Sequence, residues 1–380
     1  MVREVTFDFQ SVHRDLIRGD LIQEGGPGAI PRRPGIFRIF DVNGNLILLE
    51  KTHNLADRLG RFYRSSPRPG IPDLREITDR VEFCPTDSPF ESSYLLYLER
   101  RRWFPDTYRT MRTFPRYHLL RIDARQRFPR IYSSQQVRTG ARYFGPLRSR
   151  AHLEQLKNTL ERTFGIRPCE YDIQGDDPYP DCLYFQMHTC SRPCNGDIDR
   201  AGYLRDVESA IEFIRRDPTE TRETILARIR ALAQETRFEE AEQVRRQLGG
   251  EEKAGTGPPN PIFEVGHFDF VVVMRSRSAR YRKIALIRSG AILRLEEHAA
   301  DTVGETLAAS LLKMETAPRQ GAGSDYDEFC LAVSFLLRPL RSVRFFPIDD
   351  PGETASAVAG EVRTSGEGPR SGAAQGELQF

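Results

Sequence analysis

Four cysteines close together in the sequence place the tightest constraint on how this chain can fold. They are Cys169, Cys182, Cys190 and Cys194, with 12, 7 and 3 residues between successive thiols. Zinc knuckles and ribbons usually place two residues between paired thiols, and neither half of this stretch does so. Iron–sulfur clusters accept wider and less regular spacing, often with a proline beside a ligand. The spacing favours a cluster, with Zn²⁺ and unligated buried thiols as the alternatives.

The rest of the sequence indicates a reducing compartment. The first residues, MVREVTFDFQ, contain no apolar run of signal-peptide length, and the longest purely aliphatic run is short and lies near Val271. We therefore expect a cytoplasmic protein. Reducing conditions keep thiols free, so clustered cysteines bind metal more often than they form disulfides. Cys84 and Cys330 stand alone and are expected to be ordinary core thiols.

Arginine is concentrated in one segment of the chain. Residues 100–150 contain 14 arginines, no lysine and two acidic residues, with aromatic residues between them. Guanidinium groups bind phosphate and exposed rings stack on bases, so this composition favours a nucleic-acid surface. The alternative is a solvated basic face with the aromatics in the core beneath it. The residues predicted to contact DNA are Arg100, Arg101, Arg102, Arg116, Arg142 and Tyr143.

The hydrophobic pattern predicts a mixed α/β (α+β) protein. A chain of 380 residues is long enough for two or three compact modules. Apolar runs on both sides of Asn43-Gly44 predict a hairpin, and Asn54 can cap the helix that follows it. Further strands are expected near 81–84, 117–122, 130–132, 268–274, 283–288 and 291–296. Further helices are expected near 91–103, 153–164, 204–214, 225–232, 241–248, 303–314 and 326–337, and the helices at 225–232 and 241–248 together form a helical hairpin.

Several stretches together resemble the UvrC family of excinucleases, the nuclease of bacterial nucleotide excision repair. The family's GIY-YIG start is similar to PGIFRIFDVNGNLILLEK, and its Tyr-Phe-Gly-Pro motif is similar to ARYFGPLRSR. Its four-cysteine region matches the cysteine stretch in order and close spacing. Its UVR hairpin resembles ALAQETRFEEAEQVRRQLGG. The strands that precede its RNase H-like half are similar to FDFVVVMRSRSARYRKIALIRSGAILRLEEH.

The resemblance covers residues 33–346 and suggests a division of the chain. The expected parts are an N-terminal extension (1–32), a degenerate GIY-YIG-like domain (33–110), an Arg-rich and Cys-rich iron–sulfur region (111–217), a UVR-like helical hairpin (218–250), a partial RNase H-like segment (262–348) and a disordered tail (349–380). The tail is rich in Gly, Ala, Ser and Glu and offers almost nothing to bury.

The resemblance also implies a cofactor and partners. The family's four cysteines are taken to hold a 4Fe–4S cluster, which would be structural or would tune DNA affinity, because four thiolates leave no open site for substrate. The expected partners are DNA and a UvrB-like excinuclease subunit, which the family's hairpin binds. Phe238, at the predicted bend of the hairpin, is the expected contact with that protein. Packing of Phe238 within the chain is the alternative.

At the nuclease site the sequence departs from the family. A GIY-YIG nuclease needs a tyrosine to activate the nucleophile, an arginine to stabilise phosphate charge and a glutamate to hold Mg²⁺. The resemblance places Phe37 and Leu48 where the family has tyrosines, and Leu96 where it has the glutamate. Lys51 and Arg58 match the family's lysine and arginine. We therefore expect that normal incision is lost.

Two further differences bear on this expectation. Glu50 replaces a glycine that lets phosphate approach the backbone, and it adds a repulsive charge. We expect the carboxylates and histidine of the RNase H-like half to be missing, because the sequence turns to low complexity before they could appear. Asp349 and Asp350 are adjacent and would point to opposite faces of an extended segment, so they cannot form a metal pair. Two alternatives stay open. One is an active single-incision endonuclease in a shifted register, with Mg²⁺ and with Tyr63, Glu91 or Glu99 serving instead. The other is a partner adaptor with no role on DNA.

Overall fold

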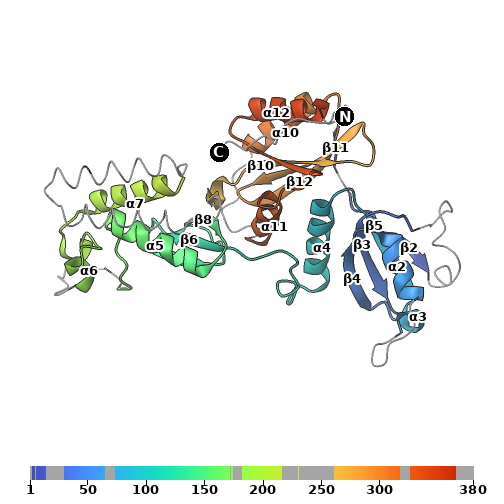
Figure 1. Ribbon diagram of the computed structural model, residues 1–380, viewed down its shortest axis with the longest axis horizontal. Coiled ribbons are helices and arrows are strands. Elements are labelled where there is room, and N and C mark those ends of the chain that lie inside the picture. The colour runs from blue at the N-terminus through green and yellow to red at the C-terminus, as the bar shows by residue number, and fades with distance from the viewer. Residues whose placement is uncertain are drawn as a thin grey trace.

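The computed structural model describes residues 2–4, 6–13, 30–64, 73–171, 173, 182–215, 230, 261–316 and 326–364. Within these residues the strands form three antiparallel sheets with helices packed on them, which confirms a mixed α/β (α+β) chain. The predicted hairpin at 218–250, including Phe238, lies outside the described residues apart from residue 230. The three sheets follow one another along an elongated molecule (Figure 1).

The first sheet contains the predicted hairpin. Its strands, in spatial order, are β2 (Gln10–His13), β5 (Arg80–Pro85), β3 (Gly35–Phe40) and β4 (Leu46–Thr52). Gly44 has a φ of +78°, as the tight turn between β3 and β4 requires. Helices α2 (Leu55–Arg64) and α4 (Pro89–Trp103) pack on opposite faces, and α3 (Leu74–Ile77) lies beside α2. The predicted cap of α2 is confirmed, because the amide of Asp57 donates to Asn54 Oδ1 at 3.1 Å.

The second sheet belongs to the module that carries the cysteines. Its spatial order is β7 (Ile131–Ser134), β6 (His118–Ile122), β8 (Arg142–Leu147) and β9 (Phe263–Glu264). The helices of this module are α5 (Arg150–Phe164), α6 (Leu183–Gln186), α7 (Arg200–Arg215) and the short 3-10 helix η1 (Pro193–Asn195). Strand β9 pairs with β8, so the chain returns to this sheet after α7. The segment that was expected to begin the RNase H-like part at 262 therefore begins in the cysteine module.

The third sheet is built from both ends of the chain. Its spatial order is β1 (Val2–Glu4), β12 (Ala291–Ala299), β11 (Tyr281–Arg288), β10 (Phe270–Arg275) and β13 (Val343–Pro347). The 3-10 helix η2 (Val265–His267) precedes strand β10. Helices α10 (Val303–Thr316), α11 (Tyr326–Leu336) and α12 (Pro351–Thr364) pack on this sheet or beside it.

The N-terminal residues correct the expectation of an extension. Strand β1 pairs with β12, and strand β2 pairs with β5, so residues 2–13 contribute an edge strand to each of two sheets. The paired residues are far apart in the chain, from 67 positions for His13 and Arg80 to 296 positions for Val2 and His298. Local sequence patterns do not predict such pairing, because strand formation depends on the neighbouring strand as much as on the β-propensity of the residues.

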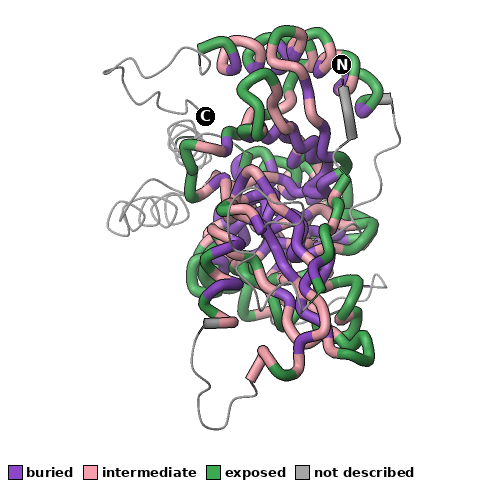
Figure 2. The backbone as a smooth tube through the Cα atoms, turned by 90° about the vertical axis from the view of Figure 1, so that its right-hand side faces the viewer, coloured by how far each residue is buried: buried purple, intermediate pink, exposed green. Residues whose placement is uncertain are grey.

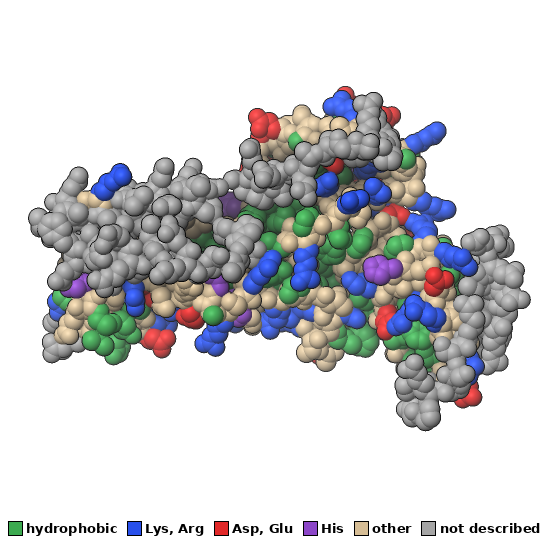
Figure 3. Space-filling model, viewed as in Figure 1, with side chains coloured by type: hydrophobic (Ala, Val, Ile, Leu, Met, Phe, Trp, Pro, Cys, Tyr) green, Lys and Arg blue, Asp and Glu red, His purple; other side chains and the backbone are tan. Residues whose placement is uncertain are grey.

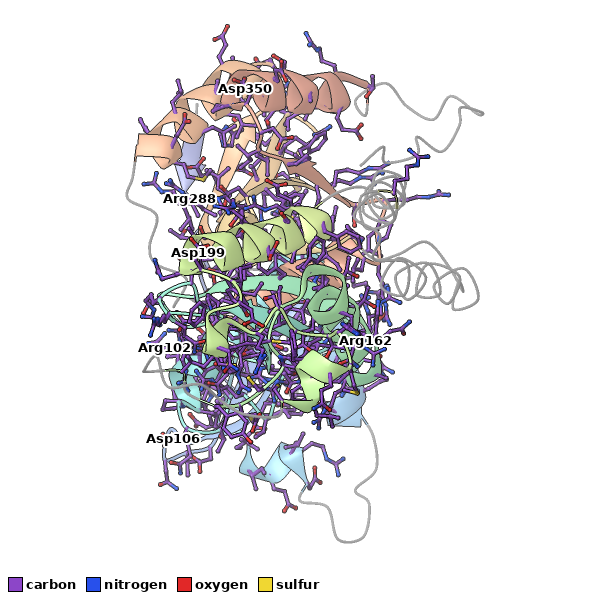
Figure 4. The ribbon with its side chains drawn as sticks, turned by 90° about the vertical axis from the view of Figure 1, so that its left-hand side faces the viewer. Arg102, Asp106, Arg162, Asp199, Arg288 and Asp350 are labelled. Atoms are coloured by element: carbon purple, nitrogen blue, oxygen red, sulfur yellow. The ribbon has the colours of Figure 1, made fainter. Side chains whose placement is uncertain are left out.

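The expectation of disorder after residue 349 is wrong for Pro351–Thr364, which form helix α12. Asp350 caps this helix, since its Oδ1 accepts the amide of Glu353 at 2.8 Å, and Figure 4 shows Asp350 at the α12 end of the molecule. Ala355, Val358 and Val362 recur at helical spacing and are buried against α10. These three small apolar side chains are enough to pack α12 on α10, and the overall composition of the segment does not reveal them. The rest of the predicted tail, 365–380, lies outside the described residues.

Helix α4 packs on both the first and the third sheets, through two separate hydrophobic clusters. Phe90 and Tyr97 of α4 belong to the same buried cluster as Phe268, Phe329 and Val272 of the C-terminal part. The ring of Phe90 packs edge-on against Phe335 with centroids 5.3 Å apart. Figure 2 shows buried residues concentrated along the centre of the molecule. Helix α4 therefore contacts the C-terminal part of the chain, and the cysteine module lies between these two regions in sequence.

Candidate nuclease remnant and cysteine centre

Strands β3 and β4 place Phe37 and Leu48 on the face of the first sheet that α2 covers. Phe37 lies directly opposite Glu50, and Ile39 lies opposite Leu48. Phe37 is fully buried, and its ring packs edge-on against Phe62 of α2 with centroids 6.0 Å apart. Leu48 packs against the same cluster. Both positions are filled by apolar side chains that stabilise the core.

The arginine that matches the family's catalytic arginine is engaged by Glu50. Arg58 Nη2 donates to Glu50 Oε2 at 2.7 Å, and the guanidinium lies 4.6 Å from the centre of the Phe62 ring. The two charged side chains are 36% and 33% exposed. The guanidinium of Arg58 is thus engaged by a carboxylate of the neighbouring strand.

Lys51 contacts helix α4, whereas Arg58 lies on helix α2 and contacts strand β4. Its Nζ donates to Ser93 Oγ of α4 at 2.7 Å. Burial lowers the pKa of Lys51, and the charge of Arg100 lowers it further. Lys51 pairs across the hairpin with Ile36, whose side chain lies in the core beneath α4. The structure therefore does not bring Lys51 and Arg58 together.

Neither Leu96 nor Glu99 offers a free carboxylate to a metal ion. Leu96 is 2% exposed and packs with Ile36 and Leu49. Glu99, one turn later, accepts hydrogen bonds from Arg38 at 2.5 Å and from Trp103 Nε1 at 3.1 Å. Its carboxylate is committed to an internal ion pair.

The two other candidates of the shifted register are also engaged. Glu91 accepts the amide of Asp87 at 2.7 Å and Lys283 Nζ at 2.6 Å. Burial raises the pKa of Glu91, and the charge of Lys283 opposes that rise. Tyr63 Oη donates to Thr78 Oγ1 at 3.1 Å, and burial raises the pKa of this phenol. These contacts hold the three candidate residues in separate places.

The Arg-rich segment differs from the sequence prediction at two residues. Tyr143 is 2% exposed, and its hydroxyl accepts the amide of Arg138 at 3.0 Å, so this ring is buried and cannot stack on a base. Arg142 is half-buried between Glu264 and Glu208, with a distance of 2.9 Å to each carboxylate. Both residues stabilise the second sheet. Other aromatics of the segment are buried too, namely Tyr117, Phe128 and Phe144.

The remaining predicted DNA contacts lie at or near the surface. Arg101, Arg102 and Arg116 are exposed, whereas Arg100 is partly buried and donates to the carbonyl of Met111. Figure 4 shows Arg102 at the edge of the molecule. Figure 3 shows Lys and Arg side chains spread over the described part of one face. The basic segment is therefore a charged surface with several of its aromatics in the core beneath it, as the second alternative describes. Binding of nucleic acid by this surface stays a prediction.

The four clustered cysteines come from successive turns and loops of the second module. Cys169 follows α5, Cys182 caps α6, Cys190 lies between α6 and η1, and Cys194 lies within η1. All four thiols are free of disulfides. Burial raises the pKa of Cys190 to about 12, and the other three thiols contribute to this rise. Burial, with Cys169 and Cys182, also raises the pKa of Cys194.

These four thiols are close enough to interact electrostatically, and they are chemically suited to hold a metal. Within the described part of the chain, however, no three His, Cys, Asp or Glu side chains are arranged around a common metal position. Soft thiolates favour Zn²⁺ or an iron–sulfur cluster over hard cations. The donor set fits a cluster, and the sulfurs would have to lose their protons and converge to hold it.

Sequence reasoning missed two residues that organise this region. Tyr203 of α7 is fully buried, and its hydroxyl donates to the carbonyl of Pro129 at 2.7 Å and accepts the amide of Arg167 at 3.0 Å. Arg167 is 5% exposed. The position of Arg167 immediately before Pro168-Cys169 was the available signal.

Comparison with known proteins identifies the second module. A family model described as UvrC/Cho excinuclease, middle domain, matches residues 117–213, which span β6 to α7. The chain is also similar to many proteins named UvrABC system protein C. That of Gemmatimonas aurantiaca is 27% identical over 305 residues, 77% of this chain and 49% of the relative.

The chain is thus similar to proteins of the UvrC family.

Other UvrC relatives show the same partial coverage. UvrABC system protein C of Anaeromyxobacter sp. is 30% identical over 59% of this chain and 32% of the relative. That of Thermoanaerobacter sp. is 24% identical over 66% of this chain and 41% of the relative. The chain thus spans less than half the length of these UvrC proteins. No solved structure matches it significantly. None of the described helices is long and apolar enough to cross a membrane.

Proposed function

We propose that this UvrC-family chain takes part in nucleotide excision repair by binding DNA and a UvrB-like protein, without the normal GIY-YIG incision. The observation that carries this proposal is the contact between Arg58 and Glu50 beside the buried ring of Phe37. The sequence resemblance assigns these three side chains to the positions at which the family has a phosphate-binding arginine, an open glycine and a reactive tyrosine.

Each substitution removes a chemical function. Phenylalanine has no proton to exchange, so Phe37 can neither accept nor deliver one during hydrolysis. Glu50 neutralises Arg58 and would repel an approaching phosphate. Leu96 offers no oxygen to a divalent cation, which prefers oxygen ligands. Glu91, Glu99 and Tyr63 are held in other contacts, so the structure does not favour the alternative of an active, rearranged Mg²⁺ site.

The DNA-binding part of the proposal rests on the exposed arginines of the basic segment. We expect Arg101, Arg102 and Arg116 to neutralise phosphates. Substitution of all three by Gln should weaken binding to duplex DNA and reduce the slope of log K against log salt by up to about 3. Fluorescence anisotropy at several salt concentrations measures this. A matched variant with Gln at Arg277, Arg280 and Arg363 should keep the slope, and an equal loss in both variants would refute the assignment.

The four cysteines would hold a 4Fe–4S cluster, which supplies a redox-active and structurally stabilising centre when bound. Anaerobic purification followed by absorption spectroscopy and metal analysis tests this part. About four irons per chain and a brown protein are expected. A colourless protein with one Zn²⁺ per chain would replace the cluster by a zinc site.

The UvrB-like partner is proposed from the UVR-like sequence at 218–250. Phe238→Ala should weaken co-purification with UvrB, because aromatic anchors contribute most of the binding energy of many interfaces. Arg237→Ala is the neighbouring control. Unchanged co-purification of the Phe238 variant would favour packing of this ring within the chain.

A further inference from the structure

Arg167 is a buried cation at the start of the cysteine loop. Helix α5 ends at Gly165, whose φ of +66° turns the chain inward, and Arg167 follows two residues later with 5% of its surface exposed. A buried guanidinium is unfavourable unless its donors are satisfied. The contacts of this side chain are therefore informative about its role.

The donors of Arg167 connect the sheet to the cysteine loop. Its Nε donates to the carbonyl of Phe128 at 2.9 Å. Its Nη1 donates to the carbonyl of Tyr171 at 2.6 Å and lies 3.4 Å from the carbonyl of Cys169. The same nitrogen lies 3.5 Å from Cys169 Sγ, within hydrogen-bond range for sulfur. One planar group thus fixes both the backbone and the thiol of Cys169.

A second arginine supports the same loop through its backbone. Arg130 donates to the carbonyl of Cys169 at 3.1 Å, and its guanidinium lies 4.4 Å from the centre of the Tyr132 ring. At the other end of the cysteine stretch, the amide of Arg192 donates to Cys190 Sγ at 3.4 Å. Among the side chains in the described part of the chain, Arg167 is the one that directs an N–H at the sulfur of Cys169.

We propose that Arg167 is a positioning residue of the cysteine centre, which holds the Cys169 loop in place and donates an N–H···S hydrogen bond to Cys169. This inference rests on the proposed metal-binding role of the four cysteines. Outer partners of metal ligands orient the ligand and tune the metal, and hydrogen bonds to sulfur help to set the reduction potential of iron–sulfur clusters. A cationic donor beside a cluster sulfur stabilises the more negative, reduced state.

Lysine cannot replace this arginine in full. Its ammonium is a compact point charge, whereas the guanidinium presents donors in a fixed planar fork that reaches Phe128, Cys169 and Tyr171 together. Arg167→Lys therefore keeps the positive charge and removes the planar set of N–H donors. Arg162→Lys is the matched control, because Arg162 is an exposed residue on α5.

The experiment uses the whole 380-residue chain, purified anaerobically. Arg167→Lys should release iron to a chelator about 10-fold faster than wild type and should show a more negative midpoint potential in voltammetry. Arg162→Lys should match wild type in both respects. Circular dichroism checks that each variant is folded. Equal release rates and equal potentials for Arg167→Lys and wild type would overturn the inference while leaving the cluster in place.

A measurement on the wild-type protein tests the inference even if the Arg167→Lys variant does not fold. Protein grown with arginine labelled with ¹⁵N in the guanidinium group should show a labelled nitrogen coupled to the reduced cluster in pulsed EPR. Absence of this coupling in a protein that contains iron overturns the role of Arg167. Absence of iron from the wild type instead overturns the proposed cluster itself, so the two failures are distinguishable.

Discussion

The carboxylate of Glu161 on α5 is 4% exposed in the core of the cysteine module. Its Oε1 accepts no hydrogen bond from a described residue, and the nearest cation, Lys157 Nζ, lies 3.7 Å away. Burial raises the pKa of Glu161 to about 7, although Lys157 opposes the rise. The folded protein therefore binds a proton at Glu161 over a pH range in which the unfolded chain has released it.

This difference predicts a pH dependence of stability. Because the pKa is higher in the folded state, the contribution of Glu161 is fully present below about pH 4.5, the ordinary value, and is lost as the pH rises through about 7. The free energy of unfolding should fall by on the order of 2–3 kcal/mol across this window. Glu161→Gln should remove this part of the dependence, as measured by urea unfolding of both proteins at several pH values.

The difference between wild type and variant isolates Glu161 from the other titrating groups. Glu154→Gln, on the same helix and more exposed, serves as the control and should keep the wild-type profile. Parallel profiles for wild type and Glu161→Gln between pH 4.5 and 7 would show that this carboxylate is ionised in the folded protein.

At the scale of single residues, the four cysteines are indicated by their spacing, and their binding of a metal or cluster stays a prediction. The residues predicted for the basic surface are wrong in part. Tyr143 and Arg142 were misassigned because interleaved arginines and aromatics look the same whether the rings face solvent or the core. Only the pairing of β8 with β6 and β9 shows that Tyr143 lies in the core and that Arg142 reaches Glu264.

Among the helices and strands, α12 is the one that lies in a segment predicted to be disordered. Val358 is fully buried against α10, whereas its neighbour Ala357 is exposed. Val358→Asp places an unpaired charge in this packing and should cost at least about 3 kcal/mol of stability. Ala357→Asp on the exposed face should change stability by less than about 0.5 kcal/mol. Thermal unfolding of the two variants measures the difference, and similar melting temperatures would show that α12 does not dock.

The elements that were predicted correctly carry local signals. The hairpin has Asn43-Gly44 at its turn, and α5 has apolar residues at helical spacing after the Ser149 cap. The missed strands lack such signals. Strand β8 contains Gly145-Pro146, and proline in a strand argues against a strand assignment. Strands β1, β2 and β9 are two to four residues long and depend on partners that are distant in sequence.

Across the whole molecule, a buried ion cluster connects the first and third sheets. Lys283 of β11 lies 2.7 Å from Asp87 Oδ2 and 2.6 Å from Glu91 Oε1, and all three side chains are at most 12% exposed. Arg33 also pairs with Asp87. Together with the shared core at Phe90, this cluster predicts that the two sheets unfold as one unit.

Removal of Lys283 tests this coupling. Lys283→Met leaves Asp87 and Glu91 with less compensation in a buried place, and it should lower the free energy of unfolding by about 3–5 kcal/mol. Addition of Glu91→Gln to this variant should restore part of the loss, since it removes one of the stranded charges. Lys313→Met, at an exposed lysine of α10, is the control. A loss no larger than that of the control would mean that the cluster does not hold the sheets together.

The central proposal is that this chain, which is similar to UvrC proteins, binds DNA without normal incision. Its most direct test is incubation of the purified protein with Mg²⁺, the UvrA and UvrB partner proteins, and a duplex that carries a single labelled lesion. We expect a retained protein–DNA complex in a mobility-shift gel and an uncut strand in a denaturing gel. Cleavage near the lesion that Arg58→Ala abolishes would contradict the account.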